Sequence, residues 1–167
     1  MSTSLISNPP YNMKWKLPVF AQLQPRFNDC ELPPEKNANF AFILTALNKM
    51  DAKAVFILPC SVLNGGLKQE DEIRKYLIEK NLIEAVITCP DNMFESTGIA
   101  TCIIVFNKHK STTQIELIDM RNTYEVEERE QRGQYGSSSH TNRVYKKAVK
   151  VFSDEQMERA IKAIEEH

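Results

Sequence analysis

The stretch Ala54-Val55-Phe56-Ile57-Leu58 decides the fold, because it is a continuous apolar run between Lys53 and Pro59. Such a run is typical of a strand that is buried on both faces, as in a parallel sheet. Two further runs of this kind, Ile83 to Thr88 and Thr101 to Phe106, predict two more buried strands.

Helical periodicity separates these strands. Residues Asn37 to Met50 carry apolar side chains at helical spacing, and Asn37 is the expected N-cap. Glu70 to Glu79 is the next amphipathic segment, after a Gly65-Gly66 turn. A short last strand is expected at Ile115 to Ile118. This alternation of strands and helices predicts an α/β fold with a mostly parallel sheet.

A last helix is expected over Ser153 to Glu166. Ser153 and Gln156 stand at the two positions of a capping box. The apolar residues of this segment that fall on one helical face are Met157, Ile161 and Ile164.

Three segments have no clear periodicity. Asn12 to Lys36 is irregular, and it is either an ordered functional loop or a flexible insertion. Glu125 to Asn142 is charged and rich in Gly and Ser, which predicts a mobile loop or linker. A basic cluster follows, and it forms either a solvated face or a phosphate contact. Its members are Arg143, Lys146, Lys147 and Lys150.

Composition restricts the class of protein. The chain has 167 residues, of which 42% are apolar, so it can build one domain with a real core. Its net charge of −1 argues against a basic DNA clamp. The four cysteines are far apart and form no C-x-x-C pair, so we expect reduced thiols and no metal site. Without a signal peptide or a run of transmembrane length, a cytoplasmic protein is expected.

The chain opens with a candidate catalytic motif. The apolar run Leu5-Ile6-Ser7 predicts a strand, and Asn8-Pro9-Pro10-Tyr11 follows it. The carboxyl end of a strand is where the catalytic residues of open α/β sheets lie. Asn-Pro-Pro-aromatic after a strand resembles the catalytic loop of the amino-methyltransferases. The competing interpretation is a rigid surface turn, since Asn-Pro commonly opens turns.

The residue types suit methylation of an amino nitrogen, whose lone pair is delocalised. The Asn8 side-chain carbonyl and a backbone carbonyl can accept its two hydrogens and so aim the lone pair at a methyl donor. Pro9 and Pro10 fix the backbone and remove competing donors. Tyr11 offers an aromatic face for a flipped base.

Further segments extend the resemblance to the modification subunit of type I restriction-modification systems, a DNA adenine-N6 methyltransferase. They agree with that family in order and spacing from about Ser4 to the C-terminus. These segments are Asn39 to Ile43, Leu58 to Gly66, Glu72 to Leu77, Pro90 to Ile99 and Thr101 to Lys108.

This resemblance implies a Rossmann-like class I methyltransferase fold, S-adenosylmethionine as the donor, and adenine in DNA as the acceptor. Asn8 and the Pro9 carbonyl would hold the amino group, and Tyr11 would stack on the flipped base. Phe94 would contact the other side of the base, although core packing beside Met93 and Ile99 would also explain it. DNA, a specificity subunit and a restriction subunit are the implied partners, and no membrane is involved.

The chain departs from this family at its start. Only seven residues precede Asn8, and the five glycines form no Gly-x-Gly pattern, so the donor-binding half is expected to be missing. We therefore expect the C-terminal half of a catalytic domain at 1–122, a polar loop at 123–142, and a basic segment with a helix at 143–167. The donor-binding residues stay unassigned, although Asn8 would border them. Alone, such a chain should be inactive, and an exposed strand around Leu5 would favour dimerisation.

Two alternatives stay open. A fragment of a protein-glutamine or RNA N-methyltransferase would also carry Asn-Pro-Pro-Tyr. A non-catalytic module is the other, in which the Gly/Ser segment, the basic cluster and the last helix dock a specificity subunit.

Overall fold

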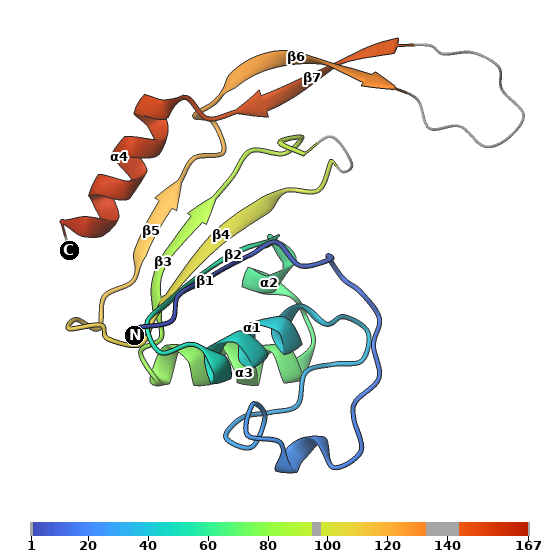
Figure 1. The fold of residues 1–167 in the computed structure, drawn as a ribbon, viewed down its shortest axis with the longest axis vertical. Coiled ribbons are helices and arrows are strands. Elements are labelled where there is room, and N and C mark those ends of the chain that lie inside the picture. Colours follow the sequence, from blue (N-terminus) through green and yellow to red (C-terminus); the bar gives the residue numbers. More distant parts are fainter. Residues whose placement is uncertain (1, 95–97, 133–143, 167) are drawn as a thin grey trace, which may run out of the picture.

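A computed structural model describes residues 2–94, 98–132 and 144–166 and shows a mixed α/β fold (Figure 1). A five-stranded sheet has the order β1-β2-β4-β3-β5. Its strands are β1 (Leu5–Ser7), β2 (Lys53–Pro59), β3 (Ile83–Thr88), β4 (Thr101–Asn107) and β5 (Glu116–Asp119). β1 and β2 are parallel, as are β3 and β5, while β4 runs antiparallel to both of its neighbours. All strands except β4 therefore point the same way, which confirms the mostly parallel sheet.

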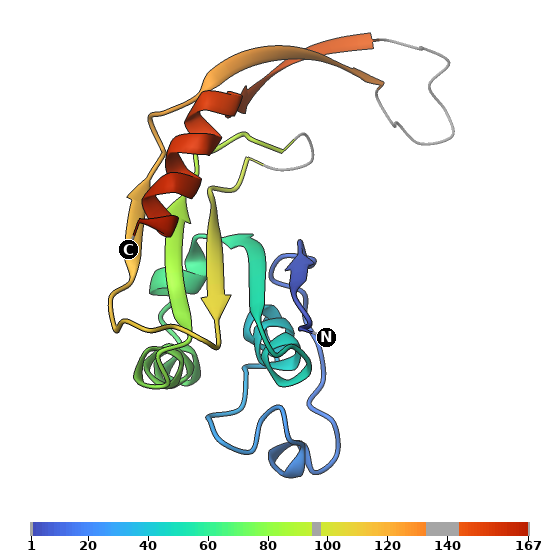
Figure 2. The ribbon, with the colours of Figure 1, turned by 60° about the vertical axis from the view of Figure 1, so that its left-hand side comes forward.

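Helices flank this sheet on both faces (Figures 1 and 2). The helices are α1 (Asn39–Lys49), the short α2 (Ser61–Asn64), α3 (Lys68–Glu79) and α4 (Asp154–Glu165). α1 and α3 lie against one face, and α4 lies against the other face beside β5.

The two faces bury separate hydrophobic clusters. The larger cluster joins α1 and α3 to the strands, and Phe56 meets Phe106 edge to face with ring centroids 6.0 Å apart. Ile104 belongs to this cluster, whereas its neighbour Ile103 packs against the smaller one under α4. This alternation along β4 follows from the period of two in a strand.

The expected cap of the first helix is wrong. α1 begins after Ala38, and no side chain caps it. The Asn37 amide instead donates to Glu70 Oε1 at 3.0 Å, so this side chain joins the loop to α3.

The long segment Asn12 to Lys36 is packed against the body, which argues against a flexible insertion. Phe27 is completely buried. The Trp15 indole N–H donates to the Pro34 carbonyl at 2.8 Å. Its one helical turn is a 3-10 helix, η1 (Ala21–Leu23).

The prediction of a loop from Glu125 to Asn142 is wrong over its first half. Strand β6 (Glu125–Arg132) pairs antiparallel with β7 (Val144–Val151) in a separate two-stranded hairpin. The charges that suggested a loop instead face one another across the strands, as in the 3.7 Å ion pair between Lys146 and Glu128. The remainder, residues 133–142, lies outside the described residues, as does Arg143.

Acidic side chains therefore neutralise part of the positive charge of the basic cluster. Besides Lys146, Lys150 forms an ion pair, with Asp91 in the loop after β3. This pairing agrees with the interpretation as a solvated face.

The capping box of α4 is confirmed. Gln156 N–H donates to Ser153 Oγ at 3.3 Å, and the Gln156 side chain accepts from Ser153 N–H at 2.9 Å. The expected apolar face is only partly covered, because Ile164 packs on the sheet while Met157 and Ile161 are exposed. Among the described residues, no helix is long and apolar enough to cross a membrane.

Candidate functional site

The carboxyl ends of β1, β2, β3 and β5 meet at one edge of the sheet (Figure 2). Asn8 to Tyr11 follows β1 at this edge, and residues 89–94, the Phe94 loop, follow β3. In both views these residues lie beyond the end of β1 (Figures 1 and 2). The topology therefore brings the motif and the Phe94 loop to the same edge.

Asn8 and Tyr11 contact each other directly. The Tyr11 hydroxyl donates to Asn8 Oδ1 at 3.0 Å, so the carbonyl side of the amide is turned toward the ring. Asn8 is exposed, Tyr11 is half-buried, and Pro9 is buried beneath them. Burial raises the pKa of the Tyr11 hydroxyl, and the Cys102 and Cys89 thiols raise it further. Tyr11 therefore stays a neutral donor that can hold the amide in one orientation.

A pair of amides fixes the end of this loop on α1. Asn12 N–H donates to Asn39 Oδ1 at 3.0 Å, and Asn39 Nδ2 donates to Asn12 Oδ1 at 2.9 Å. Asn39 is almost completely buried, and Asn12 adopts a left-handed backbone with φ of 52°. Asn is one of the few residues that tolerate this region. Sequence reasoning missed this pair, although the tendency of Asn toward left-handed turns was a usable signal.

Phe94 is half-buried and belongs to neither hydrophobic cluster. Both interpretations of Phe94, contact with the base and packing beside Met93 and Ile99, therefore stay open. Contacts among the described residues do not join Phe94 to Tyr11, so the opposed aromatic pair stays a prediction.

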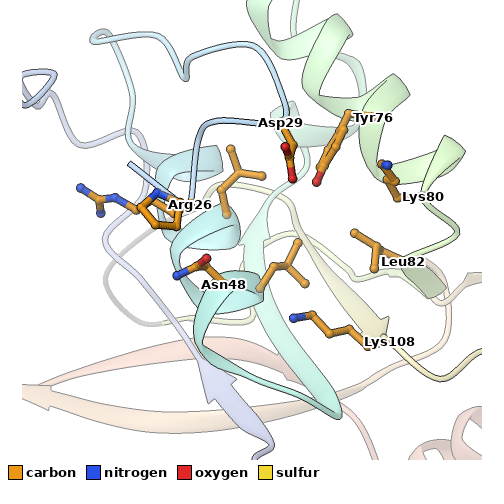
Figure 3. Close-up of a pocket in the computed structure, with 10 residues that line it drawn as sticks. Arg26, Asp29, Asn48, Tyr76, Lys80, Leu82 and Lys108 are labelled. Atoms are coloured by element: carbon orange, nitrogen blue, oxygen red, sulfur yellow. The ribbon is translucent and has the colours of Figure 1, made fainter. Parts of the chain in front are cut away.

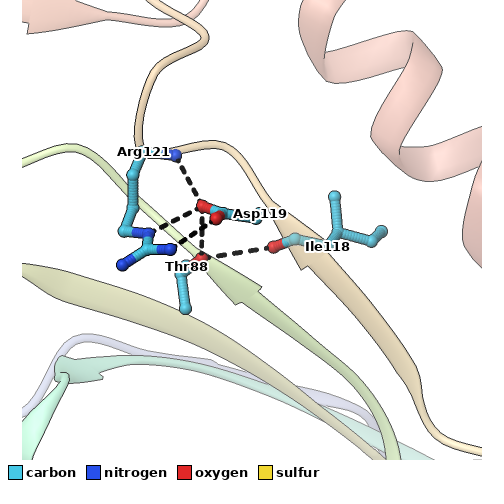
Figure 4. Close-up of polar contacts among 4 residues, drawn as sticks. All are labelled: Thr88, Ile118, Asp119 and Arg121. Carbon is cyan, nitrogen blue, oxygen red and sulfur yellow. Dashed lines mark hydrogen bonds and ion pairs between the residues drawn. The ribbon is translucent and has the colours of Figure 1, made fainter.

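A polar cluster that sequence reasoning missed lies at the ends of β3 and β5 (Figure 4). Thr88 Oγ1 donates to Asp119 Oδ1 at 3.0 Å. Asp119 also accepts from Arg121 Nε at 2.9 Å and from Nη2 at 2.6 Å. Hydrogen bonds from Arg121 hold the pKa of Asp119 far below its usual range. The two bonds to Asp119 fix the orientation of the Arg121 guanidinium at this edge. Nothing in the sequence pointed to this cluster, because its residues only lie at or just after the ends of two strands.

Cysteine thiols lie behind the motif. Cys102 and Cys89 are buried, and Cys60 is half-buried after β2. Burial raises the pKa of Cys89 to about 11 and also raises that of Cys102. These groups are therefore protonated at neutral pH and behave as packing residues.

The glycines of the described residues, Gly65, Gly66 and Gly98, form no Gly-x-Gly turn of the kind that cradles a nucleoside. Such a cradle needs glycines that let the backbone approach the ligand. Gly65 has no such room, because an added Cβ would lie 2.6 Å from Glu70 Oε2 and 2.8 Å from the Ser61 carbonyl oxygen. Glycines with positive φ are absent from the described ranges. Gly66 has open space around it, with no atom within 4 Å of an added Cβ, but it too lacks a positive φ.

A separate hollow of about 390 Å³ lies at the opposite edge (Figure 3). It is lined by the end of α3, including Tyr76 and Lys80, and by Lys108 after β4. Lys108 Nζ donates to the Met50 carbonyl at the end of α1, where a cation is favourable. This hollow is remote from the motif.

Comparison with known proteins now decides the family. The model of the N-6 DNA methylase family matches residues 2–165. The chain belongs to the N-6 DNA methylase family. The match covers almost the whole of this chain, including the motif Asn8 to Tyr11.

Named relatives agree. The type I restriction enzyme MpnII methylase subunit of Mycoplasma pneumoniae is 35% identical over 77% of this chain and 24% of its own length. The MjaIX methylase subunit of Methanocaldococcus jannaschii is 27% identical over 76% of this chain and 24% of its own length. The chain therefore spans about a quarter of these relatives.

A solved structure shows the same architecture. The type I restriction-modification methyltransferase subunit from Streptococcus thermophilus superposes with a TM-score of 0.78 at 26% identity. The match covers 97% of this chain and 31% of that one. All three relatives are type I methylase or methyltransferase subunits.

Proposed function

We propose that this chain supplies the adenine-binding side of a type I modification subunit. In the complete subunit, the methyl group of S-adenosylmethionine would pass to N6 of adenine in DNA. The observation that carries the proposal is the Tyr11–Asn8 hydrogen bond at the carboxyl end of β1. It orients a side-chain carbonyl at the edge where an open α/β sheet binds its substrates.

Asn8 is the residue that would act on the amino group. Its Oδ1 has two acceptor positions, so it can keep the Tyr11 bond and accept one adenine N–H. The Pro9 carbonyl would accept the other. Both contacts oppose delocalisation of the nitrogen lone pair and direct it away from the base plane. These residues position the nitrogen and remove no proton before methyl transfer.

Tyr11 and Phe94 would hold the base itself. An enzyme that reacts with a base in a duplex must flip it out, and stacking on aromatic rings offsets part of that cost. Tyr11 is half-buried and fixed by Asn8, so its ring is preorganised. Phe94 stands on the other loop of the same edge.

The partners follow from the family. DNA, a specificity subunit that selects the sequence, and a restriction subunit would complete a cytoplasmic complex. In the isolated chain, β1 is an edge strand whose Ile6 is 85% exposed, so we expect it to pair with a second copy.

The test is adenine methylation by the complete subunit with its specificity subunit. Asn8→Ala should lower kcat by about 100-fold or more, as loss of a positioned polar group does in other active sites. Asn48→Ala, which removes an exposed amide from α1, should leave kcat unchanged. Equal activity of the two variants would contradict the proposal.

A further inference from the structure

Lys150 joins the base of the β6–β7 hairpin to the Phe94 loop. Its backbone N–H donates to the Asn92 carbonyl at 3.2 Å. Its ammonium forms an ion pair with Asp91. A single residue of β7 thus contacts two consecutive residues that lie just before Phe94.

The position of Lys150 is itself fixed by its surroundings. Val149 before it is completely buried, and Phe152 after it packs in the cluster under α4. The Lys150 ammonium also lies 4.6 Å from the centroid of the Tyr124 ring, a cation–π contact. β7 at this point is therefore part of the rigid body, and it can hold the loop in place.

The loop needs such an attachment because its backbone is unusual. Asn92 has a left-handed backbone with φ of 55°. A Cβ added at Gly98 would lie 3.1 Å from Asn92 Oδ1. Asn tolerates a left-handed backbone, and a residue in this uncommon region keeps one conformation where its surroundings determine it.

We propose that Lys150 is a positioning residue that sets the Phe94 loop for the flipped adenine. This inference rests on the function proposed above and adds a role for β7 in it. Lys150 acts through Asp91 and Asn92 and does not touch the base. Loss of its charge should let Phe94 move relative to Asn8 and Tyr11, and misplacement by about 1 Å can cost up to about 100-fold in rate.

The test uses the complete subunit with its specificity subunit and DNA that carries 2-aminopurine at the target adenine. Lys150→Met keeps the aliphatic stem and removes the charge. We expect it to lower kcat and the fluorescence rise on base flipping by about tenfold, with a smaller change in KM for DNA. Lys150→Arg should restore most of both. Lys146→Met, on the same strand and paired with Glu128 within the hairpin, is the matched control and should resemble wild type.

Amide hydrogen exchange in the 167-residue chain tests the attachment of the loop independently of catalysis. Lys150→Met and Asp91→Asn should both speed exchange at Met93 and Phe94 without changing exchange in β2. The second variant keeps the test valid if the first folds poorly. An inactive wild-type subunit would overturn the proposed function, and this inference with it. An active wild type in which Lys150→Met matches Lys146→Met in kcat and fluorescence would overturn this inference alone.

Discussion

The two loops at the candidate site are held in opposite ways. The Asn8 to Tyr11 loop ends in a part-buried pair of uncharged amides, in which the exposed Asn12 bonds to the buried Asn39 of α1. The Phe94 loop is held by a charged pair at the surface, Asp91 with Lys150. An uncharged amide pair does not titrate and is not screened by salt, whereas an exposed ion pair is weakened by acid pH and by salt.

The difference indicates that the two loops have different roles. The loop with Asn8 holds the reacting nitrogen, where small errors of position are costly, and it belongs to the stiff part of the molecule. The residues before Phe94 are attached at the surface by the Lys150–Asp91 ion pair and by the hydrogen bond from Lys150 N–H to the Asn92 carbonyl. The ion pair makes this attachment the more sensitive of the two to pH and salt.

The largest effect should follow loss of the Asn12–Asn39 pair. Asn39→Ala removes an almost completely buried amide and leaves the Asn12 N–H and side-chain carbonyl without their partner. We expect the free energy of unfolding in urea to fall by about 2 kcal/mol. Asn48→Ala on the exposed side of α1 should change it by less than about 0.5 kcal/mol. Similar values for the two variants would remove the contrast between the loops.

The next effect concerns the anchor behind the second loop. Ser153→Ala breaks the capping box of α4 directly after β7, and it should cost about 1 kcal/mol of stability. Ser61→Ala, in an exposed position of the short α2, is the control for the loss of a hydroxyl. If amide exchange near Lys150 stays unchanged in Ser153→Ala, α4 does not support the Phe94 loop.

The smallest effect depends on pH. The hydrogen bond and charge of Lys150 lower the pKa of Asp91 below its ordinary 3.8. The folded state therefore favours the carboxylate, and this contribution is present above the ordinary pKa and disappears as the pH falls through the lower one. Wild type should lose its small advantage over Asp91→Asn between pH 5 and acid pH, as measured by urea midpoints. A difference that does not vary with pH would show that the ion pair does not hold the loop.

The sheet was predictable because its strands are continuous apolar runs. Ala54 to Leu58 and Ile83 to Thr88 are strands in the structure within a residue or two of the prediction. The hairpin was not predictable in the same way. β6 contains Glu127, Glu128 and Glu130, and it becomes a strand through its pairing with the lysines of β7. A search for hydrophobic periodicity cannot detect a partner that lies about twenty residues away along the chain.

The site was predictable in part for a similar reason. Asn8 to Tyr11 is a local motif at a strand end, so the sequence located it. Asn39, Lys150 and the cluster of Thr88, Asp119 and Arg121 come from distant elements. Only the folded sheet brings them to one edge, and each of these residue types is common on ordinary surfaces.

The central claim is that this chain holds the acceptor side of a methyltransferase site and lacks the donor cradle. Calorimetric titration of S-adenosylmethionine into the purified 167-residue chain tests it most directly. We predict no heat of binding, because the glycines form no Gly-x-Gly pattern and no glycine in the described ranges has a positive φ. Saturable binding with a micromolar Kd would contradict the account, since the donor would then bind to residues assigned here to the core or to the acceptor edge.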